Sequence, residues 1–241
     1  MDGVDPRSAE REAGELYRDS PWPIRREIAV THEAWLEHVA SPGTWWSGAE
    51  RVEFVGALWA ALDDSDERPP WHVPQPPHGA LLPAAAHAMA YRLARHAHTA
   101  TAAWYEATVD ALGRGPAAFV ELAALASTGC SVAAFGPALG IERPELLAPR
   151  PGEPTRTAPP LVDAGMNWVP VVPPADERAA VVQATSAVPA EFAMVWRLGG
   201  VQYMPLEEMV NLAWRRPGSP FDRRQLELVA TRLSAERECF Y

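Results

Sequence analysis

The chain has 241 residues, of which 48% are hydrophobic, so it is long enough to fold around one large or two small apolar cores. Its 31 acidic and 21 basic residues give a net charge of -10. A negative surface repels nucleic-acid phosphates and anionic lipid headgroups. We therefore expect neither nucleic acid nor a membrane as a partner.

The N-terminal segment is polar and acidic, without the basic start and apolar run of a secretory signal. We predict that residues 1–21 are a disordered lead-in. Cys130 and Cys239 are the only two cysteines in the sequence, which is too few for a disulfide framework. These features predict a cytoplasmic protein.

An uncharged stretch, residues 122–141, has the length of a membrane span. It is rich in Ala, Gly, Ser and Thr and contains Pro137, which makes it less apolar than a typical lipid-facing helix. A packed core helix is the favoured interpretation. Cys130 in this stretch is expected to be a buried, inert thiol, and Glu121 before it to stabilise the first turn of the helix.

Apolar residues recur at helical spacing along most of the chain, which predicts an all-α fold. The first helix is expected to begin at Ser47, because Ser47 and Glu50 have the spacing of a capping box. Its predicted core stripe is Val52, Val55, Trp59 and Leu62. Further helical segments are predicted at 84–112, 117–139, 176–186, 189–198, 205–214 and from 222 onward.

Nine prolines in residues 142–174 exclude a regular helix there and predict a linker or an extended strap. This segment separates a predicted unit at 22–141 from a second one at 175–241. A shift of 174 positions superposes the first helix on the last, although any two amphipathic helices would share part of this pattern. The pairs are Val52 with Leu226, Glu53 with Glu227, Val55 with Val229, and Trp59 with Leu233, so the three apolar residues of the last helix are also expected in a core.

The final segment, RRQLELVATRLSAERECFY at 223–241, resembles alkylhydroperoxidase D proteins. Their motif is a Glu, then a CxxC beginning twelve positions later, then a His four positions after the second Cys. Glu227 and Cys239 have the first spacing, and Phe240 and Tyr241 fill the two places after Cys239. Residues 119–141 are similar to the closing helix of the related carboxymuconolactone decarboxylase unit, and the resemblance extends over about 22–241.

The resemblance implies an AhpD-like helical bundle, with one complete unit and the front half of a second. It also implies a thiol oxidoreductase with an antioxidant role, small organic hydroperoxides as substrates, and a dithiol or lipoyl-type reductant. No cofactor or metal is implied, and the family suggests a homo-oligomer. In such chemistry a thiolate cleaves the peroxide O–O bond, and a second thiol captures the resulting sulfenic acid. Cys239 maps to the resolving thiol and Glu227 to the proton relay.

Carrying the motif back by 174 positions places Ser65 and Arg68 at the two cysteine positions and His72 at the His position. The first unit is therefore expected to hold a degenerate site. At the other end, the attacking residue of the motif would follow Tyr241. One hypothesis is that the attacking residue is a selenocysteine encoded by UGA, since a selenol ionises more readily than a thiol. A frameshift, a shortened product or a degenerate gene would explain the missing residue equally well.

Two other functions remain open. The loss of the cysteines at positions 65 and 68 favours a non-catalytic helical module for oligomerisation or partner binding. A decarboxylase or lactone-processing enzyme would instead use an acid-base histidine, for which His72 is the positional candidate. Turnover of an organic hydroperoxide distinguishes these functions.

Overall fold

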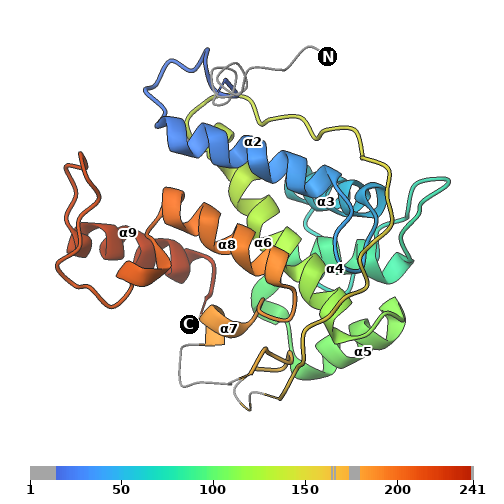
Figure 1. Cartoon of the computed structure of the whole chain (residues 1–241). Helices are drawn as coiled ribbons and strands as arrows, with labels where there is room; N and C mark the ends of the chain where they lie inside the picture. Colours follow the sequence, from blue (N-terminus) through green and yellow to red (C-terminus); the bar gives the residue numbers. More distant parts are fainter. Residues whose placement is uncertain (1–14, 164, 166, 174–179, 240–241) are drawn as a thin grey trace, which may run out of the picture.

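The computed structural model describes residues 15–163, 165, 167–173 and 180–239 (Figure 1). These residues form helices joined by loops and one isolated bridge between Val162 and Val171, and they contain no strand. The prediction of an all-α fold is confirmed. The helices are α2 (Arg26–Ala40), α3 (Gly48–Asp63), α4 (Ala84–Arg95), α5 (Ala102–Leu112), α6 (Pro116–Ala138), α7 (Ala180–Gln183), α8 (Pro189–Gln202) and α9 (Arg223–Glu236).

The apolar helix α6 lies in the middle of the molecule, with α3, α4, α5 and α8 packed around it (Figure 1). Trp35 of α2 donates a hydrogen bond to the Thr128 hydroxyl of α6 over 2.9 Å. The most hydrophobic stretch of α6 is 67% buried, and Leu122 and Leu125 are fully enclosed. Among the described residues it is the one helix with the length and composition of a membrane span. The indole of Trp59 donates to the carbonyl of Gly129 over 3.0 Å, and an added Cβ at Gly129 would meet Leu58 at 2.8 Å. The small residues of α6 therefore allow its neighbours to approach closely.

The start of α3 follows the sequence prediction. The Ser47 hydroxyl accepts a hydrogen bond from the Glu50 amide, and the Glu50 carboxylate accepts one from the Ser47 amide over 2.8 Å, which completes the capping box. Val55 and Trp59 are buried in the main core, and Val52 and Leu62 pack against it while half-buried. The predicted apolar stripe is therefore the face that α3 presents to the core.

Four helical segments differ from the prediction. The predicted helix at 176–186 begins outside the described residues and is helical only over Ala180–Gln183 in the described part. The first described helix is α2, which precedes Ser47 and buries Trp35, Leu36 and Val39, although the same apolar spacing was present in the sequence. The predicted helix at 84–112 is broken into α4 and α5 by the short turn Ala97–Thr99, and Thr101 caps α5. The predicted helix at 205–214 contains only the 3-10 turn Leu206–Glu208 before the chain turns away.

The Pro-rich segment runs as an extended strap along the body and contains no helix in its described residues. Its backbone amides at Arg150, Thr155 and Arg156 donate to the carbonyls of Ala40, Gly43 and Thr44, at 2.7, 3.1 and 2.9 Å. These hydrogen bonds give partners to backbone carbonyls at the end of α2 and in the loop between α2 and α3. The strap therefore covers the connection that leads into α3.

The N-terminal lead-in was predicted to be disordered. Residues 1–14 lie outside the described chain, and Leu16 and Tyr17 pack against the body. Tyr17 is buried, its hydroxyl lies 2.6 Å from Nδ1 of His32, and its ring contacts Phe135. Burial lowers the pKa of His32 to about 4. Tyr17 of the lead-in is therefore held against α2 by a hydrogen bond with His32, which is neutral at pH 7.

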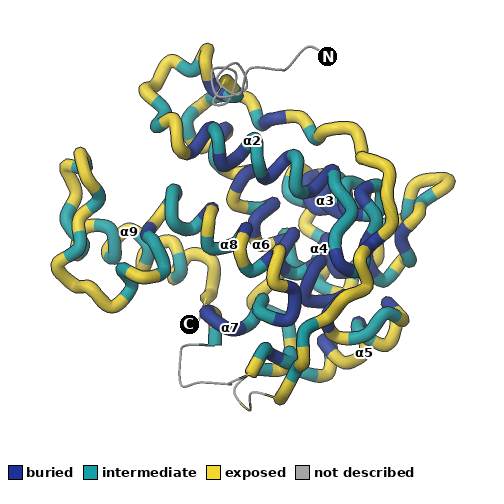
Figure 2. Tube along the Cα trace, viewed as in Figure 1, coloured by how far each residue is buried: buried dark blue, intermediate teal, exposed yellow. Residues whose placement is uncertain are grey.

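The predicted second unit divides into two parts. Helix α8 adds Met194 and Leu198 to the same core as α3 and α6, whereas α9 stands beside the body and is mostly exposed (Figures 1 and 2). Val229 and Leu233 are 66% and 61% exposed, and Leu226 is half-buried, so their predicted place in a core is wrong. The spacing predicted the helix correctly, but no apolar surface in the described chain covers this face.

Candidate functional site

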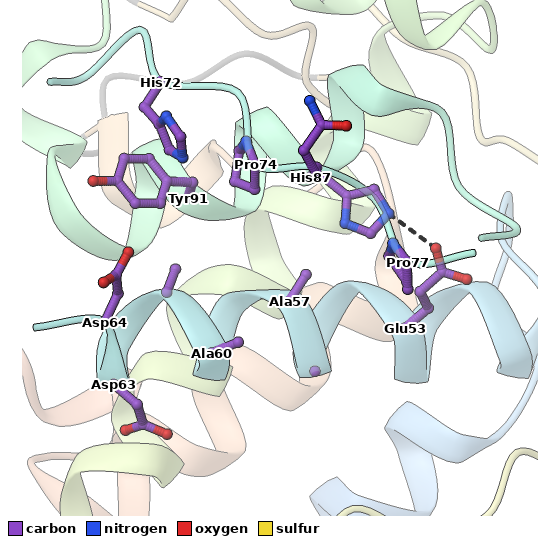
Figure 3. Close-up of a pocket in the computed structure, with 13 residues that line it drawn as sticks. Glu53, Ala57, Ala60, Asp63, Asp64, His72, Pro74, Pro77, His87 and Tyr91 are labelled. Atoms are coloured by element: carbon purple, nitrogen blue, oxygen red, sulfur yellow. Dashed lines mark hydrogen bonds and ion pairs between the residues drawn. The ribbon is translucent and has the colours of Figure 1, made fainter. Parts of the chain in front are cut away.

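A pocket of about 740 Å³ lies between α3, α4 and the Pro-rich loop that joins them, and we call it the α3–α4 pocket (Figure 3). Its volume falls in the range of small-molecule sites. Small residues of α3, including Gly56, Ala57 and Ala60, leave the space open, and polar side chains converge around it. These polar residues are Glu53, Asp63, Asp64, His72, Gln75, His87 and Tyr91.

An imidazole and a carboxylate are paired in this pocket. Nε2 of the buried His87 lies 3.0 Å from Oε1 of Glu53 (Figure 3). The Glu53 carboxylate also accepts hydrogen bonds from the amides of Leu81 and Leu82, at 2.8 and 3.2 Å, so the loop fixes its orientation. A carboxylate that orients an imidazole in this way is an arrangement suited to proton transfer.

His72 reaches the same pocket from the loop. Its ring lies edge-on to Tyr91, with centroids 5.0 Å apart (Figure 3). A hydrogen bond from the backbone amide of Asp66 is the main reason that the pKa of Asp64, another residue of the pocket, is lowered. The α3–α4 pocket therefore brings together Glu53 and His72, the two first-unit residues that the shift of 174 matched to the family motif.

The two other motif positions of the first unit do not line this pocket. The side chain of Arg68 pairs with Asp64 and Asp66, and its backbone carbonyl accepts from the Tyr91 hydroxyl over 3.1 Å. Ser65 is exposed on the loop. No cysteine is among the described residues that line the pocket, so these residues support acid-base chemistry rather than thiol chemistry.

A second concave site lies along α9. This α9 groove, of about 760 Å³, is walled by apolar residues of α9 and its entry loop, and by polar residues of the body. Cys239 lines it and is exposed. The apolar wall comprises Phe221, Leu226, Leu228, Val229, Ala230 and Leu233, and the body contributes Ser131, Gln202 and Tyr203.

Cys239 lies just beyond the end of α9, which does not continue to the end of the chain as its sequence suggested. Glu238 adopts a left-handed conformation with φ 53°, and its amide donates to the Ala235 carbonyl over 3.3 Å. The Cys239 amide donates to the Ser234 carbonyl over 2.9 Å. These two bonds form a Schellman motif, which terminates the helix and fixes the backbone of Cys239.

Glu227 lies three turns earlier on α9 and does not line the groove. Its Oε1 accepts hydrogen bonds of 2.6 Å from both the Tyr203 hydroxyl and Nε of Arg223. The bond from Tyr203 is the main reason that the pKa of Glu227 is lowered, while burial and Glu227 together raise the pKa of Tyr203 to about 12. Glu227 therefore positions Tyr203, which faces the groove, and does not itself reach Cys239.

A third group of charged residues is fully buried, and we call it the Arg51 cluster. The Arg51 guanidinium pairs with Glu121 at 2.5 Å and with Glu191 at 2.7 Å, and Glu191 also pairs with Nε2 of His38 at 2.7 Å. The other oxygen of Glu121 accepts from the amide of Trp45 at 2.7 Å. The cluster joins α2, α3, α6 and α8.

Burial raises the pKa of Glu121 more than Arg51 lowers it, whereas Arg51 and His38 outweigh burial at Glu191 and lower its pKa. The prediction that Glu121 stabilises the first turn of its helix is wrong, because α6 begins at Pro116 and has no acidic residue in its first turn. The partners of Glu121 lie 70 or more positions away in the sequence, so they were not predicted. An arginine and a glutamate within otherwise apolar helical stripes were the available signal.

In the part of the chain that the structure describes, no three His, Cys, Asp or Glu side chains are grouped to hold a metal ion. The functional residues therefore fall into three places: the α3–α4 pocket, the α9 groove and the Arg51 cluster. Comparison with protein-family models, curated proteins and solved structures finds no match for this chain, so its function is inferred from these three places.

Proposed function

We propose that this chain is an alkylhydroperoxidase D-like thiol oxidoreductase that reduces small organic hydroperoxides at Cys239. The observation that carries the proposal is the position of this exposed thiol in a groove with an apolar wall. An apolar wall binds the alkyl or aryl part of a hydroperoxide, and the exposed thiol leaves room for the peroxide group. The spacing of Glu227 and Cys239 resembles the family motif, in which Cys239 would be the resolving thiol. We assign the attack to Cys239 instead because it is the exposed thiol of the groove.

The reaction begins when the Cys239 thiolate attacks the outer oxygen of the hydroperoxide. The O–O bond breaks, the alkoxide takes up a proton and leaves as the alcohol, and Cys239 becomes a sulfenic acid. An external dithiol then attacks this sulfur and releases water, and its second thiol frees Cys239 while the dithiol becomes a disulfide. A dithiol or lipoyl-type molecule is therefore the proposed reductant, and a reducing cytoplasm would keep both cysteines free.

The hydroxyl of Tyr203 is the polar group of the groove that Glu227 orients. In this proposal Tyr203 holds the peroxide by a hydrogen bond, and Glu227 is a positioning residue. Tyr203→Phe should then raise KM for hydroperoxide more than it lowers kcat, since the nucleophile is unchanged. Glu227→Gln should have the smaller effect, because glutamine still accepts a hydrogen bond from Tyr203.

The test is consumption of cumene hydroperoxide with dihydrolipoamide as reductant. Unaltered protein should remove hydroperoxide faster than the reductant alone, and Cys239→Ser should remove it no faster than the reductant alone. Equal consumption by both proteins would overturn the proposal. Phe221 lies on the groove wall, so Phe221→Ala should weaken the binding of cumene hydroperoxide more than that of hydrogen peroxide.

The exposed face of α9 favours a second candidate function, a helical module for self-association. Leu228, Val229 and Leu233 are all more than half exposed on this helix, and Val210 and Leu212 are exposed in the loop before it. Exposed apolar patches of this kind are typical of interaction surfaces. We propose a homo-oligomer formed through this face. Light scattering should show a multimer that Leu233→Glu dissociates, whereas Leu81→Glu, at an exposed site elsewhere, should leave it intact.

A further inference from the structure

The two cysteines of the chain lie near the same groove, although 109 positions separate them in the sequence. Cys239 lines the α9 groove, and so does Ser131, the neighbour of Cys130 on α6. Cys130 is only half-buried, contrary to the prediction of a buried thiol. The groove therefore joins the surroundings of both thiols.

A further contact holds the terminal turn against the body. The Glu238 carboxylate pairs with Nε2 of His98 at 3.1 Å, which ties the turn to the segment between α4 and α5. Burial raises the pKa of the Cys130 thiol to about 11, and the positive charge of Arg237 opposes this rise. Arg237 lines the α9 groove together with Ser131, the neighbour of Cys130. Arg237 precedes Cys239 by two residues.

We propose that Cys130 and Cys239 form a disulfide within one chain, and that Cys130 is the resolving thiol for the sulfenic acid formed at Cys239. The second half of this statement rests on the proposed function. Cys130 attacks the sulfur of Cys239, the S–OH bond breaks, and the hydroxide that leaves takes the proton of Cys130 to form water. The two sulfurs are joined, and the external dithiol reduces them to complete the cycle.

Both thiols are free in the structure, so the bridge requires the terminal turn to move toward α6. A disulfide needs Cα atoms within about 7 Å of each other. The turn is the exposed end of an exposed helix, with one ion pair to the body among its described contacts, so this movement opposes little packing. A mostly protonated Cys130 reacts slowly, so the bridge should form faster as the pH is raised.

The first experiment tests the pairing without a peroxide. The protein is oxidised at low concentration with diamide, an azo compound that takes up two hydrogens from two thiols, and is then digested and analysed by mass spectrometry. We expect a linked peptide pair containing Cys130 and Cys239, loss of both titratable thiols, and a single-chain band on a non-reducing gel. Dimers linked between chains, or retention of both thiols, would overturn the pairing. Cys130→Ser and Cys239→Ser should each lack the linked pair.

The second experiment uses one equivalent of cumene hydroperoxide in place of diamide. Appearance of the same linked pair supports the resolving role of Cys130. If Cys239 is oxidised but the pair never forms, the resolving role fails while the proposed function stands. If diamide forms the pair but the hydroperoxide leaves Cys239 reduced, the pairing stands and the proposed function fails. His98→Ala removes the ion pair with Glu238 and should change the rate of bridge formation, not its partners.

Discussion

The Arg51 cluster and the α9 helix both pair an arginine with a glutamate, but in opposite surroundings. Arg51, Glu121 and Glu191 are at most 1% exposed, whereas Arg232 and Glu236, which pair on α9, are 76% and 54% exposed. A buried charge depends on its partner, because water cannot replace that partner, while an exposed pair contributes little to stability. The charge pairs that stabilise the fold therefore lie in the body, and α9 is available for chemistry or association.

The largest expected effect comes from removing the central arginine. Arg51→Met leaves Glu121 and Glu191 buried without their guanidinium, which should lower the free energy of unfolding by about 3–5 kcal/mol. Urea denaturation measures this change. Arg232→Met, the matched substitution in the exposed pair of α9, should lower it by less than about 1 kcal/mol. Equal losses for the two variants would refute the contrast between the regions.

A smaller effect is expected from acid, through His32. Its two ring nitrogens lie 2.6 Å from the Tyr17 hydroxyl and 2.8 Å from Nε2 of Gln202, and its pKa is lowered to about 4. The unfolded chain therefore binds more protons than the folded chain between about pH 6.5 and 4, so stability falls as the pH drops through this range. The loss at His32 should be roughly 2–3 kcal/mol.

Denaturation of unaltered protein and His32→Gln at several pH values measures the loss that belongs to His32. The variant should show a shallower decline of stability between pH 6.5 and 4, since glutamine does not titrate. Identical slopes would show that other groups control the acid sensitivity. The lowered pKa of Glu191 adds a decline in acid that both proteins should share.

A smaller loss of stability is expected when a methyl group is added next to the Arg51 cluster, and a second glycine serves as the control. A Cβ at Gly43 would lie 1.9 Å from Oε1 of Glu121 and 2.2 Å from the Arg51 guanidinium, so Gly43→Ala should cost about 1–2 kcal/mol. At Gly56 the nearest atom to such a Cβ is 4.0 Å away, on Leu146. Gly56→Ala lies within α3 and should be neutral or stabilising by up to about 1 kcal/mol. In thermal melts the midpoint should fall for Gly43→Ala and should stay unchanged or rise for Gly56→Ala.

The smallest change in stability is expected on the apolar face of α9. Val229→Glu alters a side chain that is 66% exposed, so the free energy of unfolding should change by less than about 0.5 kcal/mol. A loss of several kcal/mol, measured in dilute protein by urea denaturation, would show that this face packs against a core. At higher concentration the variant should lose the proposed self-association, which separates the effect on assembly from the effect on folding.

Local patterns in the sequence predicted the elements that depend on neighbours along the chain. The capping box of Ser47 and Glu50, the stripe of α3 and the core helix α6 belong to this class. Contacts between distant residues could not be predicted. The ion pair of Arg51 with Glu191 and the shared groove of Ser131 and Cys239 arise from tertiary packing, which periodicity does not encode.

The exposed face of α9 shows a related limit of sequence analysis. Its apolar spacing predicts an amphipathic helix, and Asp222 with Gln225 forms a capping box as good as that of α3. Spacing states which residues share a face and does not state what covers that face. Leu226, Val229 and Leu233 were therefore placed correctly on one stripe and wrongly in a core. For the site, the sequence located Glu53 and His72, which line one pocket, but not His87, whose ring pairs with Glu53.

The most direct test of the central claim is the chemical state of Cys239 after exposure to a hydroperoxide. Cys130→Ser removes the proposed resolving thiol, so a sulfenic acid at Cys239 should persist long enough to be trapped. We expect one equivalent of cumene hydroperoxide, followed by dimedone, to give a single adduct that peptide mapping assigns to Cys239. An unmodified Cys239 under these conditions, with the hydroperoxide unconsumed, would contradict the proposed chemistry.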